Sequence, residues 1–271
     1  YAKTYLKIVG GCCFLNALIP IFSSYLRAFG YTKQPLIATL VANAVNFGLN
    51  AVFLFGLHAG VAGVAWATVL SRILNLGIVI VASKLLVKAK EDPERLKNTE
   101  VFAQIIKVGL PSALETALYN VAMTLTIRFL NQMDASGFNV TARAYAAQIA
   151  NFSYCAGAAL AQANAIMTGW RIGEGDYEAC DKGTKKAACI GILVAAGLEA
   201  LFVFSADVLI RIFTQDLEMI RLVKTLLAID ILLEVGRVTN LVFGQALKTS
   251  GDAVYTTVIG VLFMYLCMVG G

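Results

Sequence analysis

Long apolar runs constrain the fold of this chain more than any other feature of its sequence. Crossing the hydrocarbon core of a bilayer takes roughly 20 mainly apolar residues, and lipid leaves only helices and closed barrels as ways to satisfy the backbone. The runs lack the alternation of barrel strands, so we expect an all-α membrane protein, a polytopic helical bundle. Eight spans are predicted, the last incomplete, near residues 5–26, 35–56, 62–87, 109–131, 141–168, 187–212, 220–246 and 254–271.

Composition excludes several classes of function. The chain is 59% hydrophobic and 14% charged, whereas charged residues make up about a quarter of a soluble domain. Its Lys and Arg residues form no basic stripe with interleaved aromatics, so no nucleic acid is expected as a partner. Six cysteines without metal-ligand spacing and a single histidine, His58, argue against a metal site and against an enzyme. The expected partners are the bilayer and a small-molecule substrate, with no cofactor, and the protein is expected to be a monomer.

A hydrophilic segment, Lys88–Lys97, separates the third predicted span from the fourth. It divides the chain into the second half of an N-terminal lobe (1–88, about three spans), a linker (89–106) and a C-terminal lobe (107–271, about five spans, its last helix missing). Of 22 Lys and Arg residues, thirteen lie in the alternate connections that include this linker, seven lie in the others, and two lie inside spans. Positive charge is retained on the cytoplasmic side, so the linker is predicted to be cytoplasmic.

An internal repeat appears when the chain is shifted by 221 residues. Lys3–Ile8 then aligns with Lys224–Ile229, and Leu26–Gly30 aligns with Leu247–Gly251; seven of 28 aligned positions are identical. The shift moves the first span onto the seventh, and six spans return the chain to the side on which it started. We therefore expect two pseudo-symmetric six-helix lobes of one orientation, the first truncated, in a protein of about twelve spans that is cut at both ends.

The sequence contains seven short segments typical of one protein family: Leu26–Pro35, Ala42–Asn50, Phe53–Gly56, Gly60–Thr68, Gly109–Ser112, Gly169–Ala179 and Leu247–Asp252. In the right order, they resemble parts of the multidrug and toxic compound extrusion (MATE) transporters. The resemblance implies that the chain covers about helices four to eleven, in a plasma membrane, specifically a bacterial inner membrane. It also implies an antiporter that exports organic compounds.

Glu234 is the clearest candidate for transport chemistry. It lies near the centre of the seventh span, with Asp230 one turn before it and Arg237 one turn after it, so the three share one helical face. A charged group at membrane depth is unfavourable unless it is paired or hydrated, which makes such residues functional candidates. Glu234 either exchanges a proton or binds a cation, or it forms a permanent structural ion pair with Arg237.

Glu115 lies about one turn inside the fourth span and is predicted to share a face with Tyr119. It either attracts a cationic substrate from a cavity wall or sits near a helix N-terminus as an interfacial carboxylate. On the fifth span, Tyr145, Gln148 and Asn151 form a polar stripe. The stripe either faces Glu234 across the lobe or serves helix-to-helix hydrogen bonding.

Asn43, Asn46 and Asn50 recur at helical spacing on the second span. The resemblance to MATE transporters implies a cation-coupling network at Asn46 and Asn50. The alternative is structural packing of the amides between helices.

These observations favour secondary active efflux of amphipathic, cationic organic compounds, coupled to entry of H⁺ or Na⁺ through alternating access. The alternative is a flippase for lipid-linked oligosaccharides, because related two-lobed exporters share this architecture. A flippase would need a strongly basic cavity for pyrophosphate, and Arg237 and Arg72 are the cations inside spans.

Overall fold

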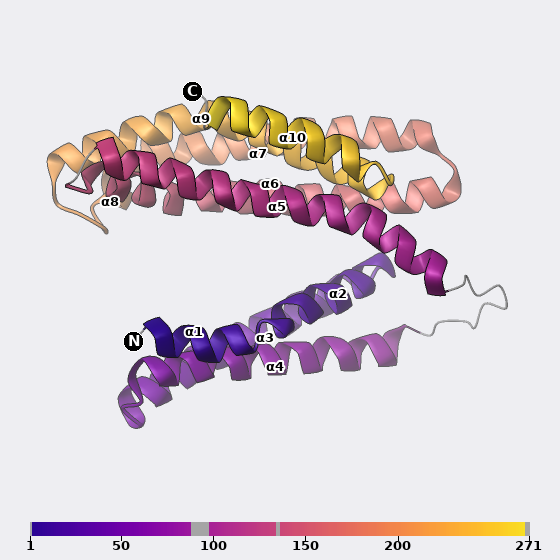
Figure 1. The fold of residues 1–271 in the computed structure, drawn as a ribbon, viewed down its shortest axis with the longest axis horizontal. Helices are drawn as coiled ribbons and strands as arrows, with labels where there is room; N and C mark the ends of the chain where they lie inside the picture. The colour runs from indigo at the N-terminus through magenta and orange to yellow at the C-terminus, as the bar shows by residue number, and fades with distance from the viewer. Residues whose placement is uncertain (1, 88–97, 134–135, 269–271) are drawn as a thin grey trace. The chain divides into compact units, whose positions relative to one another are not determined.

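The computed structural model describes residues 2–87, 98–133 and 136–268, and every regular element in these ranges is a helix. The chain divides into two compact units, Tyr1–Arg95 and Leu96–Gly271 (Figure 1). The first unit contains α1 (Ala2–Gly11), α2 (Phe14–Ala28), α3 (Lys33–Ala51), the π-helix η1 (Val52–Gly56) and α4 (Gly60–Leu86). The second contains α5 (Asn98–Met133), α6 (Phe138–Glu174), α7 (Tyr177–Phe204), α8 (Ala206–Ile210), α9 (Leu217–Thr249) and α10 (Ala253–Met268).

Every predicted span coincides with a helix or with two consecutive helices, which confirms the all-α membrane fold. Within the described residues, four stretches are long and apolar enough to cross a membrane, and α1 with α2 adds a fifth if they form one span bent by 42°. The four are Lys33–Gly56, Gly60–Leu86, Thr99–Met133 and Tyr177–Phe204. The break between α1 and α2 falls at Cys12 and Cys13, which the sequence placed inside an unbroken span.

The predicted linker and the observed helices differ at one boundary. Lys88–Lys97 lies outside the described residues, but residues 98–106, which were also assigned to the linker, already belong to α5. Phe102, Ile105 and Ile106 extend the apolar pattern of this helix before Lys107, where the sequence analysis started the C-terminal lobe. The helix therefore begins earlier than the charge pattern suggested.

The surface of the protein is more apolar than a water-soluble surface. Phe47, Phe55 and Phe204 are each at least 79% exposed, whereas two glutamates, Glu199 and Glu234, are fully buried. In water, large exposed apolar groups would be unfavourable and buried acids would be rare. This inverted distribution fits helices whose outer faces contact lipid.

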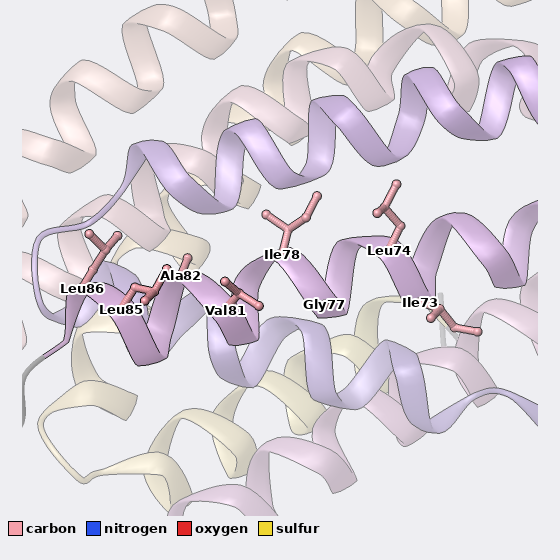
Figure 2. A pocket seen from close by; sticks show the side chains of 8 residues that line it. All are labelled: Ile73, Leu74, Gly77, Ile78, Val81, Ala82, Leu85 and Leu86. Atoms are coloured by element: carbon pink, nitrogen blue, oxygen red, sulfur yellow. The ribbon is translucent and has the colours of Figure 1, made fainter.

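In the first unit, Leu26, Ala38 and Val79 join α2, α3 and α4 in a small core. Beside it, α4 borders an apolar groove of about 660 Å³ (Figure 2). None of the groove's lining side chains is polar, so it suits a lipid chain or an apolar helix better than a polar ligand. The lining residues are Ile73, Leu74, Gly77, Ile78, Val81, Ala82, Leu85 and Leu86.

The two turns that align in the sequence repeat have the same geometry. After α2, the Gly30 N–H donates to Arg27 O and the Tyr31 N–H to Leu26 O; after α9, Gly251 and Asp252 donate to Lys248 and Leu247 in the same pattern. Gly30 and Gly251 have φ values of 82° and 93°, which side chains with a Cβ adopt only with strain. The duplicated basic-plus-glycine sequence thus encodes one type of helix end twice.

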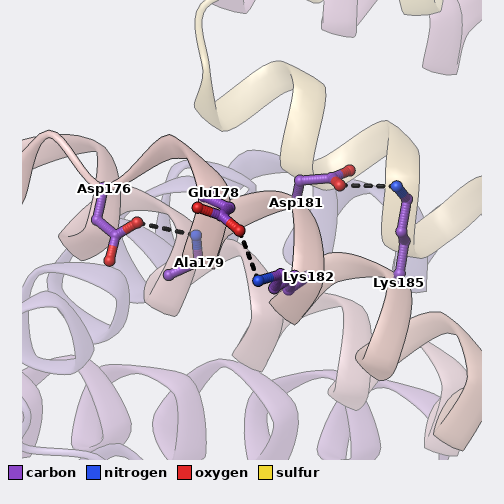
Figure 3. Close-up of polar contacts among 6 residues, drawn as sticks. All are labelled: Asp176, Glu178, Ala179, Asp181, Lys182 and Lys185. Carbon is purple, nitrogen blue, oxygen red and sulfur yellow. Dashed lines mark hydrogen bonds and ion pairs between the residues drawn. The ribbon is translucent and has the colours of Figure 1, made fainter.

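A tight hairpin joins α6 to α7. The helices are separated by only Gly175 and Asp176, and the Asp176 carboxylate caps α7 by accepting the Ala179 N–H at 2.9 Å (Figure 3). Two exposed ion pairs follow along α7, Glu178 with Lys182 and Asp181 with Lys185. With 37 residues, α6 is about 55 Å long against a hydrocarbon core of about 30 Å, so the helix must extend beyond the core.

The second unit is built on close packing of α6, α7 and α9. Gly157 on α6 and Gly191 on α7 approach Val238 of α9 from two sides. An added Cβ would lie 2.6 Å from a Val238 methyl carbon at Gly157, and 2.8 Å from one at Gly191. Helices in lipid associate through such small residues because burial of apolar surface gives little advantage there. Val238 is therefore the point at which the spacing of the three helices is set.

We predict that Gly157→Ala and Gly191→Ala each lower the melting temperature of the purified protein in detergent. Overpacking typically costs about 1–3 kcal/mol, which outweighs the roughly 1 kcal/mol that Ala gains over Gly in a helix. Gly197→Ala on α7 is the matched control, because nothing lies within 4 Å of the added carbon. Equal melting temperatures for Gly191→Ala and Gly197→Ala would contradict the packing argument, and adding Val238→Ala should restore part of the loss.

Candidate functional site

The three charged residues predicted on α9 do lie together. Arg237 donates a hydrogen bond to the Glu234 carboxylate, and its other terminal nitrogen lies 3.7 Å from Asp230 Oδ1. The Glu234 side chain is fully buried, while Arg237 is 34% exposed. The Arg237 guanidinium therefore pairs with two carboxylates. Because Arg237 is partly exposed, it also reaches from the buried interior to the protein surface, and we call this exposed side of the group the accessible edge.

Tyr154 of α6 borders this accessible edge. The Arg237 guanidinium carbon lies 5.9 Å from the centre of the Tyr154 ring, close enough for a cation–π interaction. Tyr154 is itself partly exposed. An aromatic ring beside a carboxylate-bound guanidinium is a surface that an aromatic or cationic ligand could reach.

A third buried carboxyl, Glu199 on α7, joins this group, and sequence reasoning missed it. Glu199 is fully buried and lies close enough to Asp230, Glu234 and Arg237 to interact electrostatically with all three. Its signal was present, because it is an acid near the centre of the apolar run predicted at 187–212. The rule that identified Glu234 applies equally to Glu199.

We call Glu199, Asp230, Glu234 and Arg237 the acidic cluster. It contains three carboxyl groups and one guanidinium, and four of its carboxylate oxygens have no hydrogen-bond partner among the described residues. If all three acids were ionised, the cluster would carry two uncompensated negative charges away from water. Such burial is strongly unfavourable, so the cluster requires protons or another cation.

Packing at Val238 positions the cluster. Val238 follows Glu234 by one helical turn and is held between Gly157 and Gly191. The same face of α9 therefore directs Glu234 towards α6 and α7. Ser153, one turn before Gly157, is also fully buried and donates to Ala195 O of α7 at 3.0 Å.

The predicted polar stripe on α6 does not face Glu234. Gln148 and Asn151 are exposed, and Tyr145 instead stacks on Phe213 with ring centres 5.2 Å apart. The buried face of α6 is made of small residues rather than amides, because only small residues allow the close approach of α9. This face consists of Ala142, Ala146, Ile149, Ala150, Ser153, Gly157, Ala161, Asn164 and Thr168.

Glu115 belongs to a separate contact, at which α5, α9 and α10 meet. Its carboxylate lies 2.8 Å from Lys248 Nζ and accepts a hydrogen bond from Thr257 at 3.3 Å. Tyr119 is exposed and takes no part in this contact. Glu115 therefore links three helices in this structure, and its role on a cavity wall stays a prediction.

The amides predicted in the first unit are hydrogen-bonded to one another. Asn50 Nδ2 donates to Asn46 Oδ1 at 3.0 Å, and Asn46 Nδ2 donates to the Ser71 hydroxyl of α4 at 3.2 Å. Asn43 is exposed and lies outside this chain of bonds. One buried guanidinium nitrogen of the neighbouring Arg72 has no hydrogen-bond partner among the described residues. The ion-coupling role of Asn46 and Asn50 stays a prediction.

Comparison with known proteins identifies relatives along nearly the whole chain. The MatE family model matches residues 111–270. An uncharacterized transporter, YisQ, of Bacillus subtilis is 33% identical over 97% of this chain and 59% of its own length. A probable multidrug resistance protein, NorM, of Thermotoga maritima is 26% identical over 82% of this chain and 49% of its own length. The human multidrug and toxin extrusion protein 1 is 24% identical over 89% of this chain and 42% of its own length. The chain thus spans between 42% and 59% of these curated relatives.

Solved structures share the fold. A MATE transporter in its straight conformation has a TM-score of 0.85 and 19% identity, covering 98% of this chain and 60% of that one. An outward-facing MATE family transporter has a TM-score of 0.83 and 20% identity, covering 98% and 61%. These likenesses confirm the architecture of membrane helices.

The contact between Glu115 and Lys248 predicts how charge changes at that position behave. Glu115→Gln and Lys248→Gln should each lower the free energy of unfolding by about 1 kcal/mol, the upper range for partly exposed pairs. The exchanged pair, Glu115→Lys with Lys248→Glu, should recover most of this loss, as chemical denaturation of the purified protein in detergent can measure. An exchanged pair no more stable than either single variant would contradict the ion pair.

Proposed function

The chain belongs to the MatE family of transporters, and from this we propose that the protein is a secondary active transporter that exports amphipathic organic cations in exchange for protons. The observation that carries the proposal is the acidic cluster, in which one guanidinium pairs with two carboxylates while a third carboxyl group lies within electrostatic range. A family name alone does not specify a coupling ion, but this cluster changes its net charge with the number of protons bound. It can therefore link proton binding to cation binding.

A proton fits the cluster better than Na⁺. Arg237 already occupies the space beside Glu234 and Asp230 as their cationic partner. A sodium ion placed there would lie next to a guanidinium and would need several oxygen ligands. A proton needs only one carboxylate oxygen, and Asp230 Oδ2 and Glu234 Oε2 have no hydrogen-bond partner among the described residues.

The net charge of the acidic cluster also indicates the class of substrate. With its protons bound, the cluster is close to neutral; with them released, it is negatively charged and attracts a cation. Tyr154 and Arg237 border the accessible edge and could contact the flat apolar part of such a molecule. Entry of protons would then weaken cation binding on one side of the membrane, and their release would strengthen it on the other.

The wider architecture remains part of this proposal. We infer two six-helix lobes of one orientation, alternating access between them, a monomeric protein and a location in the plasma membrane. The repeated turn at Gly30 and Gly251 supports the two-lobe organisation. Several relatives are named as multidrug resistance or multidrug extrusion proteins, which supports organic compounds as substrates.

A lipid-linked oligosaccharide flippase is not favoured. Such a protein needs free basic groups for a pyrophosphate. Arg237, the cation within the acidic cluster, is already engaged by Glu234 and Asp230. A pyrophosphate would meet carboxylates there, which repel it.

Transport by the complete protein in proteoliposomes tests the proposal. A fluorescent cationic dye such as ethidium should move against its gradient when a pH gradient is imposed, and an imposed Na⁺ gradient without a pH difference should not drive it. Glu234→Gln should reduce pH-driven transport to the background of empty liposomes, because Gln cannot exchange a proton.

Asp207→Asn is the matched control for removal of an acid from the second unit. Asp207 is an exposed carboxylate paired with Lys224 at 2.6 Å, so its loss should leave dye transport unchanged. Proton coupling through the cluster would be refuted if the wild type transported the dye only in response to a Na⁺ gradient. It would also be refuted if Glu234→Gln kept the pH-driven transport of the wild type.

A further inference from the structure

Glu199 takes no part in the ion pair on which the proposed function rests. It is fully buried, and neither of its carboxylate oxygens accepts a hydrogen bond of normal geometry from the described residues. An ionised carboxylate without a partner is strongly unfavourable in such surroundings, and a group of this kind binds a proton instead. Burial without a partner therefore favours the protonated form of Glu199 in the described conformation.

The charged groups around Glu199 support this assignment. From α9, Asp230, Glu234 and Arg237 act on it electrostatically. The positive charge of Arg237 is already engaged by the other two carboxylates. Helix α8 also contacts α7, and its acidic residue, Asp207, is satisfied by a separate lysine. Arg237 is thus the cation that acts on Glu199, and its charge is already shared by two other carboxylates.

Ser153 offers Glu199 a hydrogen-bond donor that can change its acceptor. Its hydroxyl donates to Ala195 O at 3.0 Å and is close enough to interact with Glu199. In a continuous helix the Ala195 carbonyl also accepts the N–H of Glu199, four residues later. Because a serine hydroxyl rotates freely about its C–O bond, Ser153 can turn to the carboxylate without leaving that carbonyl unbonded.

We propose that Glu199 is a second proton-binding site, which exchanges its proton with Asp230 under the control of Ser153. In the transfer, the O–H bond of the Glu199 carboxyl breaks, and a new O–H bond forms on Asp230 Oδ2. The electron pair stays on Glu199, whose new negative charge then accepts the Ser153 hydrogen bond. Asp230 is 20% exposed, so it connects the buried Glu199 to the accessible edge of the cluster.

This assignment deepens the proposed proton-coupled function and rests on it for its role in transport. Proton exchange at Glu234, the partner of Arg237, accounts for one proton. A second site would make transport depend more steeply on pH. It would also allow more than one proton to be exchanged for one bound cation.

Infrared difference spectra of the complete protein in liposomes test the site without any substrate. Between acidic and alkaline pH, the wild type should lose an absorption of a protonated carboxyl that is missing from Glu199→Gln and retained in Asp207→Asn. Gln has the size and hydrogen-bonding capacity of protonated Glu, so Glu199→Gln should fold with the wild-type melting temperature at acidic pH. A Glu199 absorption that stayed constant over the whole pH range, or was absent throughout, would overturn the proposal.

Ser153→Ala tests the proposed donor. Without the hydroxyl, the ionised form of Glu199 is less stable, so its protonated absorption should persist to a higher pH. Ser83→Ala on α4 is the matched control, because Ser83 is also buried and donates to a carbonyl of its own helix at 2.7 Å. Identical pH profiles for Ser153→Ala and wild type would show that Ser153 has only a structural role.

Dye transport separates this proposal from the proposed function. Glu199→Gln should retain pH-driven transport but depend less steeply on pH than the wild type, and equal steepness would overturn the role of Glu199 in coupling. A wild type that showed the titrating Glu199 absorption but no pH-driven transport would instead refute the proposed function and leave the proton site standing.

Discussion

The contact of Val238 with Gly157 and Gly191 is the interaction on which the second unit depends. Two residues without side chains allow α9 to approach α6 and α7 closely enough to exclude other atoms between them. One turn away, the same approach encloses Glu234 and brings Glu199 within electrostatic range of it. The chemistry of the acidic cluster thus follows from the absence of two Cβ atoms.

Lipid explains why small residues and acids, rather than large apolar side chains, occupy this interior. Helices already inserted in a bilayer gain little from burying Leu or Phe, since lipid chains are equally apolar. Close packing and interhelical hydrogen bonds take over, as in the bonds from Ser153 to Ala195 and from Asn164 to Thr184. Large apolar residues are consequently free to face outward, where Phe204 is 89% exposed.

Hydropathy predicted the helices, because each span must satisfy its backbone within a single segment whatever it packs against. The pairing of Glu234 with Arg237 was predictable for the same local reason, since three residues separate neighbours on one helical face. The orientation of α6 was not predictable in this way. Gln148 and Asn151 looked suitable for a polar interior, but the rotation of that helix is set by its partners, and the close approach of α9 selects the small face instead. Glu199 carried the same local signal as Glu234, an acid within an apolar run, but its charged partners lie on α9, so its place in the cluster could not be predicted from its own helix.

The internal repeat preserves helix ends and leaves the middle of the span free to diverge. At the shift of 221 residues, Glu234 aligns with Cys13 and Arg237 with Asn16, so the first copy lacks the charges of the second. The first copy is also broken at Cys12 and Cys13, whereas α9 continues unbroken through Glu234. Capping by Gly30 and Gly251 needs only local sequence and survives in both copies. The buried Glu234 pairs with Arg237 of its own helix, and the aligned positions of the first copy carry neither charge. Two copies of one helical plan can therefore acquire different chemistry without altering the turns that define the plan.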